Sequence, residues 1–203
     1  MSFLNQIFGP SKEIMWKEFS ELVGGEFTKG GFFKKDKVEV SYNEWIITLD
    51  TYTVSTGKSS TTYTRMRAPY INADNFRFEI YRKNIFSSLG KIFGMQDVEI
   101  GDTDFDENFI IRGNDEYKIK MLLSNPVIKF LIEQQPSIYF SVKDDESWFI
   151  KKFPEGVDEL YFTVRGIIKD VQRLKDLYDL FSETLNFLCH IGSAYQNDPN
   201  IKL

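Results

Sequence analysis

The chain carries stretches in which hydrophobic and polar residues alternate. Hydrophobic side chains stand at every second position within residues 38–42, 45–49, 76–80, 138–142 and 160–164. A period of two places alternate side chains on opposite faces of a strand, so these stretches predict half-buried β-strands.

The segment from Trp45 to about Arg67 is predicted to form one long hairpin. The residues Ser55-Thr56-Gly57-Lys58 are typical of a turn, and alternating segments rich in Thr and Tyr flank them. Trp45, Ile47 and Leu49 share one face of this hairpin, whereas the other face is mostly polar.

A spacing of three to four residues predicts helices, most clearly near the C-terminus. Hydrophobic residues recur at alternating spacings of four and three from Ile167 to Leu188, which predicts a helix over about 167–191. Additional apolar residues widen this stripe, and a wide stripe favours a helix packed across a sheet over a two-stranded coiled coil. Shorter helices are predicted at about 12–23, 84–93, 115–124 and 126–135.

The predicted strands occur in adjacent runs and do not alternate one by one with helices. This order predicts an α+β fold, in which the long C-terminal helix and the shorter helices cover an antiparallel β-sheet. No linker rich in Ser, Pro or Gly divides the 203 residues, so residues 1–203 are expected to form a single domain. The termini, residues 1–10 and 193–203, are expected to be loosely held.

Composition and charge narrow the classes of function. Lys and Arg number 25 against 30 Asp and Glu, and 25 − 30 gives a net charge of −5. An acidic chain without a run of Lys or Arg argues against a nucleic-acid binder, which needs concentrated positive charge. The single Cys and single His exclude an internal disulfide, a Cys-based zinc site and any site that needs two imidazoles.

No motif in the chain implies a cofactor, and none predicts export or membrane insertion. No stretch approaches the 18 or so apolar residues of a membrane-spanning helix, and the first residues lack the features of a signal peptide. We therefore expect no membrane span and a cytoplasmic location. The broad helical stripe and the hairpin edges suit a monomer or a homodimer equally.

Four stretches together resemble a family of uncharacterised bacterial proteins, the kind described as a domain of unknown function. They are ITLDTYTVSTGKSSTTYTRMRAPY (47–70), LGKIFGMQDVEIGDTDFDENFIIRGND (89–115), FPEGVDELYF (153–162) and CHIGSAY (189–195). The resemblance covers nearly the whole chain and implies a bacterial origin. It carries no activity, cofactor or catalytic residue that would transfer to this sequence.

Three carboxylates at alternate positions, Asp102, Asp104 and Asp106, are a candidate metal site. This spacing begins a calcium-binding loop, because hard cations require several oxygen ligands close together. Such a loop needs Gly in its sixth position and Glu in its twelfth, and here those residues are Glu107 and Gly113. On an extended segment the three side chains would still share one side, although a solvated acidic turn that caps backbone amides is the favoured interpretation.

A group of basic and aromatic residues on the hairpin and the strand after it is the candidate binding surface. If their side chains emerge on one face, they would suit a phosphate-bearing ligand, an acidic peptide or a lipid head group. The favoured alternative is that the arginines pair across strands with Asp50, Glu44 or Glu79. The candidate residues are Arg65, Arg67, Arg77, Tyr52 and Tyr63.

Three hypotheses for function follow. The first is a non-enzymatic module that uses the hairpin surface to bind a protein or a small molecule. The second is a carrier that holds a small apolar ligand in a cavity under the C-terminal helix. The third is a metal-dependent hydrolase that uses Asp102, Asp104 and Asp106. The sequence shows neither a catalytic nucleophile paired with a general base nor a cluster of metal ligands, which favours the first hypothesis.

Overall fold

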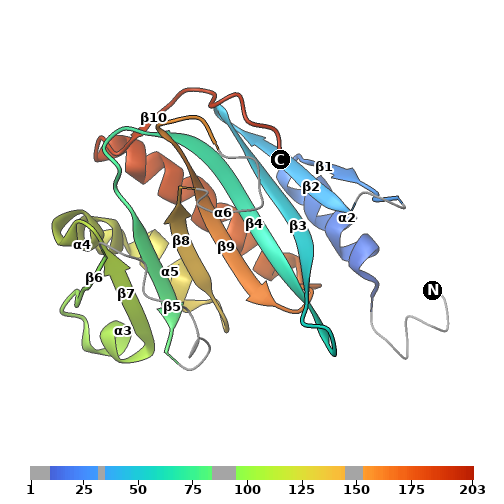
Figure 1. Ribbon diagram of the computed structural model, residues 1–203, viewed down its shortest axis with the longest axis horizontal. Coiled ribbons are helices and arrows are strands. Elements are labelled where there is room, and N and C mark those ends of the chain that lie inside the picture. Colours follow the sequence, from blue (N-terminus) through green and yellow to red (C-terminus); the bar gives the residue numbers. More distant parts are fainter. Residues whose placement is uncertain (1–9, 32–34, 84–94, 145–152) are drawn as a thin grey trace.

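The strands of this protein form one broad sheet with helices behind it. The computed structural model describes residues 10–31, 35–83, 95–144 and 153–203, and the predicted helix at 84–93 lies outside them. Seen as in Figure 1, the sheet faces the viewer, and α2, α5 and α6 lie behind it. The predicted α+β class, with an antiparallel sheet and a long C-terminal helix, is confirmed.

The helices and strands have the following bounds. The strands are β1 (Glu26–Thr28), β2 (Lys37–Tyr42), β3 (Trp45–Ser55), β4 (Ser60–Asn72), β5 (Phe78–Arg82), β6 (Gln96–Asp97), β7 (Phe109–Gly113), β8 (Tyr139–Lys143), β9 (Val157–Arg165) and β10 (Ala194–Tyr195). The helices are α2 (Lys12–Val23), α3 (Thr103–Asn108), α4 (Glu116–Ser124), α5 (Pro126–Glu133) and α6 (Val171–His190).

The strand order in the sheet is β1-β2-β3-β4-β9-β8-β5-β7-β6, and β10 pairs with β4. Every pair of these strands is antiparallel. The predicted hairpin is β3 and β4, paired in register from Thr48 and Arg67 to Ser55 and Ser60. The strands β8 and β9, far from β4 in sequence, complete the middle of the sheet.

The core lies between the sheet and α6. The hydrophobic side of α6 is fully buried, and Phe181 packs against Phe140 of β8 with ring centroids 5.6 Å apart. Phe162 of β9 and Met66 of β4 are also fully buried on this side of the sheet. The alternation in the sequence therefore gives the sheet one hydrophobic face, which packs against the helices, and one polar face on the opposite side.

Local capping groups explain where several helices begin and end. The Ser11 hydroxyl accepts a hydrogen bond from the Ile14 amide at the start of α2, and Gly24 ends that helix with φ +69°. Asn125 ends α4 and caps α5, and Pro126 occupies the first turn of α5. These three predicted helices lie within two residues of their expected bounds.

The structure corrects two predicted boundaries. The C-terminal helix begins at Val171 and not at 167, because the Asp170 carboxylate caps the Arg173 amide while the Ile168 amide donates to Thr64 Oγ1 of β4. Within the tail predicted at 193–203, Ala194 and Tyr195 form β10 against β4. Both boundaries depend on contacts with β4, and the periodicity of the sequence does not predict such contacts.

Candidate functional site

The polar face of the sheet carries a row of side chains that we call the polar row. Its members are register neighbours on five adjacent strands, in the order Thr48, Arg67, Tyr161, Ser141 and Glu79. Because Phe140 points to α6, its neighbour Ser141 points the other way, and so does the whole row. The row therefore crosses the sheet on the face opposite the helices.

Several polar atoms of this row are buried without a hydrogen-bond partner. Thr48 and Glu79 are each 1% exposed. Thr48 Oγ1, Arg67 Nε and Glu79 Oε2 have no hydrogen-bond partner among the residues that the structure describes. Buried polar atoms in folded proteins are paired in the great majority of cases, so the grouping of such atoms in one row is unusual.

Asp50 of β3 lies beside the row and binds both arginines of β4. Its carboxylate accepts hydrogen bonds from Arg65 Nε at 2.8 Å and Nη2 at 2.6 Å, and from Arg67 Nη2 at 3.0 Å. Burial by itself raises the pKa of Asp50, but the Arg65 hydrogen bond and the two guanidinium charges lower the pKa below its usual value. The favoured cross-strand pairing is thus confirmed for Arg65 and Arg67, with Asp50 as their shared partner.

Tyr52 and Tyr63 extend the same surface toward the hairpin turn. Their rings stack with centroids 5.1 Å apart, and the Arg65 guanidinium lies 5.2 Å from the centre of the Tyr52 ring. The Tyr52 hydroxyl is 3.3 Å from Thr163 Oγ1 of β9. The structure therefore brings four of the five predicted binding residues together.

Arg77, the fifth predicted residue, lies elsewhere. It forms ion pairs with Asp144 and with Asp158, the first of which follows β8 and the second of which belongs to β9. On β9, Asp158 is opposite Tyr70, near the C-terminal end of β4, whereas Arg65 and Arg67 are opposite Thr163 and Tyr161. The prediction of a single basic patch of three arginines is therefore wrong, because strand pairing places Arg77 away from the other two.

Sequence reasoning missed the contribution of β8 and its neighbours to this face. The Tyr139 hydroxyl donates to Glu79 Oε1 at 2.5 Å, and burial, followed by this hydrogen bond, raises the pKa of Tyr139. Lys143 Nζ lies 3.5 Å from the centre of the Tyr161 ring, and burial lowers the pKa of Lys143 to about 8. The alternation in 138–142 already implied that Tyr139 and Ser141 share a face, but nothing local showed that this strand pairs with β9.

Of the candidate metal residues, Asp104 and Asp106 lie in the short helix α3 and Asp102 is the residue that caps it, so the three do not share an extended segment. Asp102 caps α3 by accepting a hydrogen bond from the Phe105 amide, and its carboxylate pairs with Lys129 of α5. Asp106 accepts from the amides of Ile100 and Gly101 at 3.0 and 2.9 Å. No group of three or more His, Cys, Asp or Glu within the described ranges is arranged to hold a metal ion.

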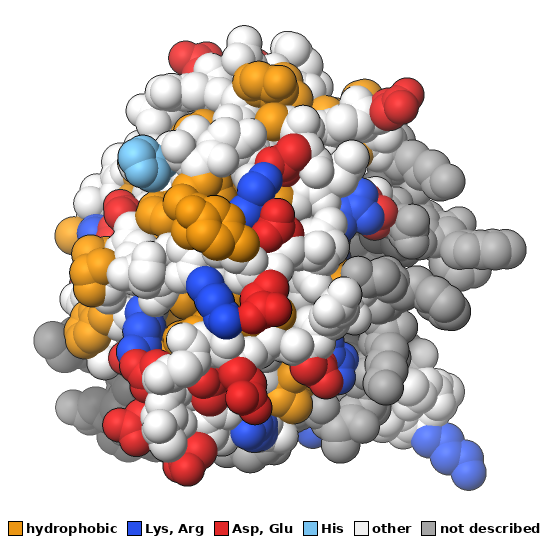
Figure 2. All heavy atoms as spheres, turned by 90° about the vertical axis from the view of Figure 1, so that its left-hand side faces the viewer, with side chains coloured by type: hydrophobic (Ala, Val, Ile, Leu, Met, Phe, Trp, Pro, Cys, Tyr) orange, Lys and Arg blue, Asp and Glu red, His pale blue; other side chains and the backbone are white. Residues whose placement is uncertain are grey.

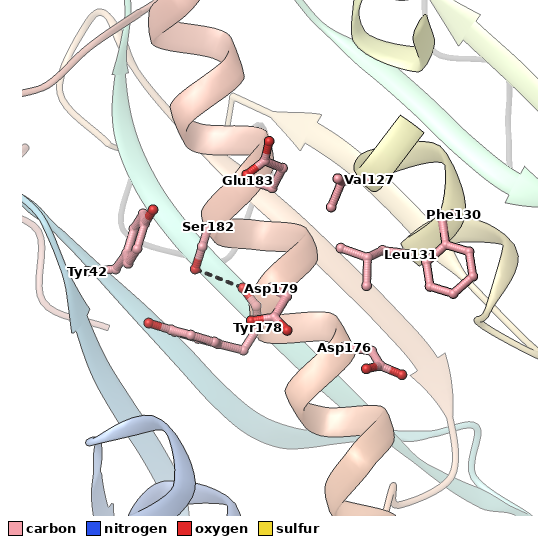
Figure 3. Close-up of a pocket in the computed structure, with 9 residues that line it drawn as sticks. All are labelled: Tyr42, Val127, Phe130, Leu131, Asp176, Tyr178, Asp179, Ser182 and Glu183. Carbon is pink, nitrogen blue, oxygen red and sulfur yellow. Dashed lines mark hydrogen bonds between the residues drawn. The ribbon is translucent and has the colours of Figure 1, made fainter. Parts of the chain in front are cut away.

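A second surface feature is a pocket of about 540 Å³ on the outer side of α6, which we call the outer pocket. Figure 3 shows α6 crossing it, with Tyr42 of β2 on one side and α5 on the other. The pocket is lined by Tyr42, Val127, Phe130, Leu131, Asp176, Tyr178, Asp179, Ser182 and Glu183. It therefore lies outside the helix, whereas the carrier hypothesis places a cavity between this helix and the sheet.

The comparisons with known proteins support the fold. No protein-family model and no curated protein matches the chain. One solved structure, the mycobacterial trehalose monomycolate transport factor A, TtfA, is similar with a TM-score of 0.52 and 6% sequence identity. The match covers 87% of this chain and 94% of that chain. At this identity the similarity shows a shared fold, and the resemblance to an uncharacterised bacterial family stays a prediction.

In the part of the chain that the structure describes, no helix is both long enough and apolar enough to cross a membrane.

Proposed function

We propose that this protein is a non-enzymatic binding module and that the polar face around Arg65 and Arg67 receives an anionic group of its partner. The observation that carries the proposal is the buried Arg67 Nε, which has no hydrogen-bond partner among the described residues. An acceptor from a bound molecule would satisfy this donor, and a charged acceptor would form the stronger bond.

The local charge supports an anionic group. Arg65 and Arg67 carry two positive charges against one negative charge on Asp50, so 2 − 1 leaves one positive charge in the cluster. The stacked rings of Tyr52 and Tyr63 provide an adjacent flat surface that is only partly buried. Aromatic and arginine side chains are the residue types that contribute most to binding at interfaces.

The structural neighbour also supports a binding role. TtfA is named as a transport factor, so this fold occurs in at least one protein whose stated role is transport. A transport role requires recognition of a partner or cargo, and the proposal assigns recognition to the polar face.

The test is a titration of the ¹⁵N-labelled protein, followed through the arginine Nε–H resonances. The probes are inorganic phosphate and a hexaglutamate peptide, which represent a phosphate ligand and an acidic peptide. We expect at least one probe to shift the Nε–H signals of Arg65 and Arg67. The substitution Arg67→Lys keeps the charge but removes Nε, so it should weaken binding by about tenfold or more.

Arg112→Lys is the matched control, because Arg112 is also a strand arginine that pairs with an aspartate, here Asp97. It should leave the affinity unchanged. If neither probe shifts the Arg65 or Arg67 signals at millimolar concentration, the proposed anion site is wrong. Equal affinities for the wild-type protein and the Arg67→Lys variant would also contradict it.

A further inference from the structure

The short helix α5 exposes hydrophobic side chains on the surface turned away from the core. Its inner residues Ile128 and Ile132 are fully buried, but Val127 is 49% exposed and Phe130 is 55% exposed. Figure 2, which turns the left-hand side of Figure 1 to the viewer, shows hydrophobic side chains on that side among acidic and basic ones. A helix with apolar residues on both sides normally has both sides covered.

Phe130, Val127 and Leu131 form the apolar side of the outer pocket. In Figure 3 these side chains lie on the α5 side of the pocket, across from Tyr178 of α6 and Tyr42 of β2. The rings of Tyr42 and Tyr178 meet edge to face, with centroids 6.2 Å apart. The pocket volume of about 540 Å³ falls within the usual range of binding sites, about 300–1,000 Å³.

The floor of the outer pocket is acidic. Asp176, Asp179 and Glu183 line it from α6, and no Lys or Arg is among the described residues that line it. Lys175 Nζ contacts both carboxylate oxygens of Asp179 at 2.6 Å. The contacts of Asp176 and Glu183 are with the uncharged amide groups of Gln172 and Asn125. Three carboxylates with one paired lysine leave a charge of −3 + 1, or −2.

The distance between Asp176 and Glu183 matches the repeat of side chains along a helix. Asp176 and Glu183 are seven residues apart, which corresponds to two turns or about 10 Å along α6. In a partner helix that lies along α6, side chains seven residues apart would also share one face and be separated by the same distance. It would place one row of cationic side chains opposite these carboxylates and apolar side chains against Phe130.

We propose that the outer pocket binds a basic amphipathic helix of a partner protein. Apolar residues of that helix would cover Phe130 and Val127, and its Lys or Arg residues would pair with Asp176 and Glu183. The three carboxylates disfavour phosphate groups and anionic lipid surfaces, because like charges repel in a partly desolvated site. This site lies on the helix side of the sheet, so it is separate from the polar face that carries the proposed function.

The test uses the full chain and a fluorescein-labelled 14-residue peptide of Leu and Lys in amphipathic helical order, with binding followed by fluorescence anisotropy. We expect the wild-type protein to bind the peptide, and Phe130→Ser to weaken binding by about tenfold or more. Asp176→Asn should weaken binding by about threefold and reduce its dependence on salt.

Tyr117→Ser is the matched control, since Tyr117 is 73% exposed on the neighbouring helix α4 and does not line the pocket. It should leave the peptide affinity unchanged. Because Phe130 is exposed, its substitution should preserve the fold, which an unchanged melting temperature would verify.

Any one of four results would overturn the proposal. The first is no binding of the Leu/Lys peptide up to 1 mM, and the second is equal binding to the wild-type protein and Phe130→Ser. The third is equal binding of a peptide in which Gln replaces every Lys. If sedimentation shows a dimer that Phe130→Ser dissociates, a second copy of this chain occupies the pocket and the proposed partner is wrong.

Discussion

Replacement of Asp50 by asparagine tests whether one buried carboxylate holds the two arginines of the polar face. The side chains involved are largely buried, with exposed fractions of 15% for Asp50, 18% for Arg65 and 12% for Arg67. The asparagine side chain would keep the size of the aspartate but would remove the negative charge between two guanidinium groups. Asp50→Asn should therefore lower the free energy of unfolding.

The expected loss follows from the contacts. Asp50 accepts three charge-assisted hydrogen bonds, two from Arg65 and one from Arg67. Removal of one partner from a buried ion pair costs about 3–5 kcal/mol. Because all three side chains keep some contact with water and an asparagine can still accept one bond, we expect the lower end, about 3 kcal/mol.

Urea unfolding at pH 7, followed by tryptophan fluorescence, measures this loss. The matched control is Asp97→Asn, because Asp97 also pairs with a strand arginine but its side chain is 77% exposed. The control should change the free energy of unfolding by less than about 1 kcal/mol. If Asp50→Asn costs no more than Asp97→Asn, the idea that Asp50 is the main counter-charge of both arginines fails.

The dependence on pH gives a second measurement of the same contact. The pKa of Asp50 lies below its ordinary value of 3.8, so the folded state favours the ionised form. A group with a lowered pKa stabilises the fold fully above its unfolded pKa, and this contribution disappears as the pH falls through the folded pKa. The difference between wild type and Asp50→Asn should stay constant from pH 7 to about pH 5 and shrink only below pH 3.8.

Two further changes probe the strands β7 and β8. Burial lowers the pKa of Lys143 to about 8. The unfolded state therefore binds this proton more tightly than the folded state does, and the free energy of unfolding should rise as the pH increases above 8. Urea unfolding at pH 7.5 and 9.5 should show this rise for wild type but not for Lys143→Met, and parallel pH profiles would contradict it. Gly113→Ala places a Cβ 2.2 Å from Ile119 Cδ1 and 2.9 Å from the Arg77 carbonyl oxygen, so it should cost about 1–3 kcal/mol. A melting temperature equal to that of wild type would contradict this expectation.

Local sequence signals predicted most of the secondary structure, because each depends on neighbouring residues alone. Ser11 and Gly24 bound α2 as the capping pattern predicts, and Asn125-Pro126 separates α4 from α5. The hairpin of β3 and β4 is likewise encoded by alternation on both sides of one turn. The acidic stretch before Phe109 is a helix and not an extended segment, since Asp102 caps it while Phe105 packs inward and stacks on Phe109.

The candidate site was predicted only where its residues belong to one hairpin. Tyr52, Tyr63, Arg65 and Arg67 share the β3–β4 hairpin, so alternation alone places them on one face. Arg77 is next to a different strand, and its partner depends on the pairing of β4 with β9. No periodicity within the sequence encodes that pairing.

The sequence by itself determined α2, α4, α5 and most of α6, the alternating strands, the α+β class and the exclusion of chemistry that needs several Cys or His residues. These follow from local geometry and composition. The tertiary structure decided that β9 lies between β4 and β8, which joins Arg67, Tyr161 and Glu79 in one row. It also decided that α5 meets α6 to form the outer pocket. Both depend on contacts between segments far apart in sequence, whose energies come from packing and cannot be read from the order of residues alone.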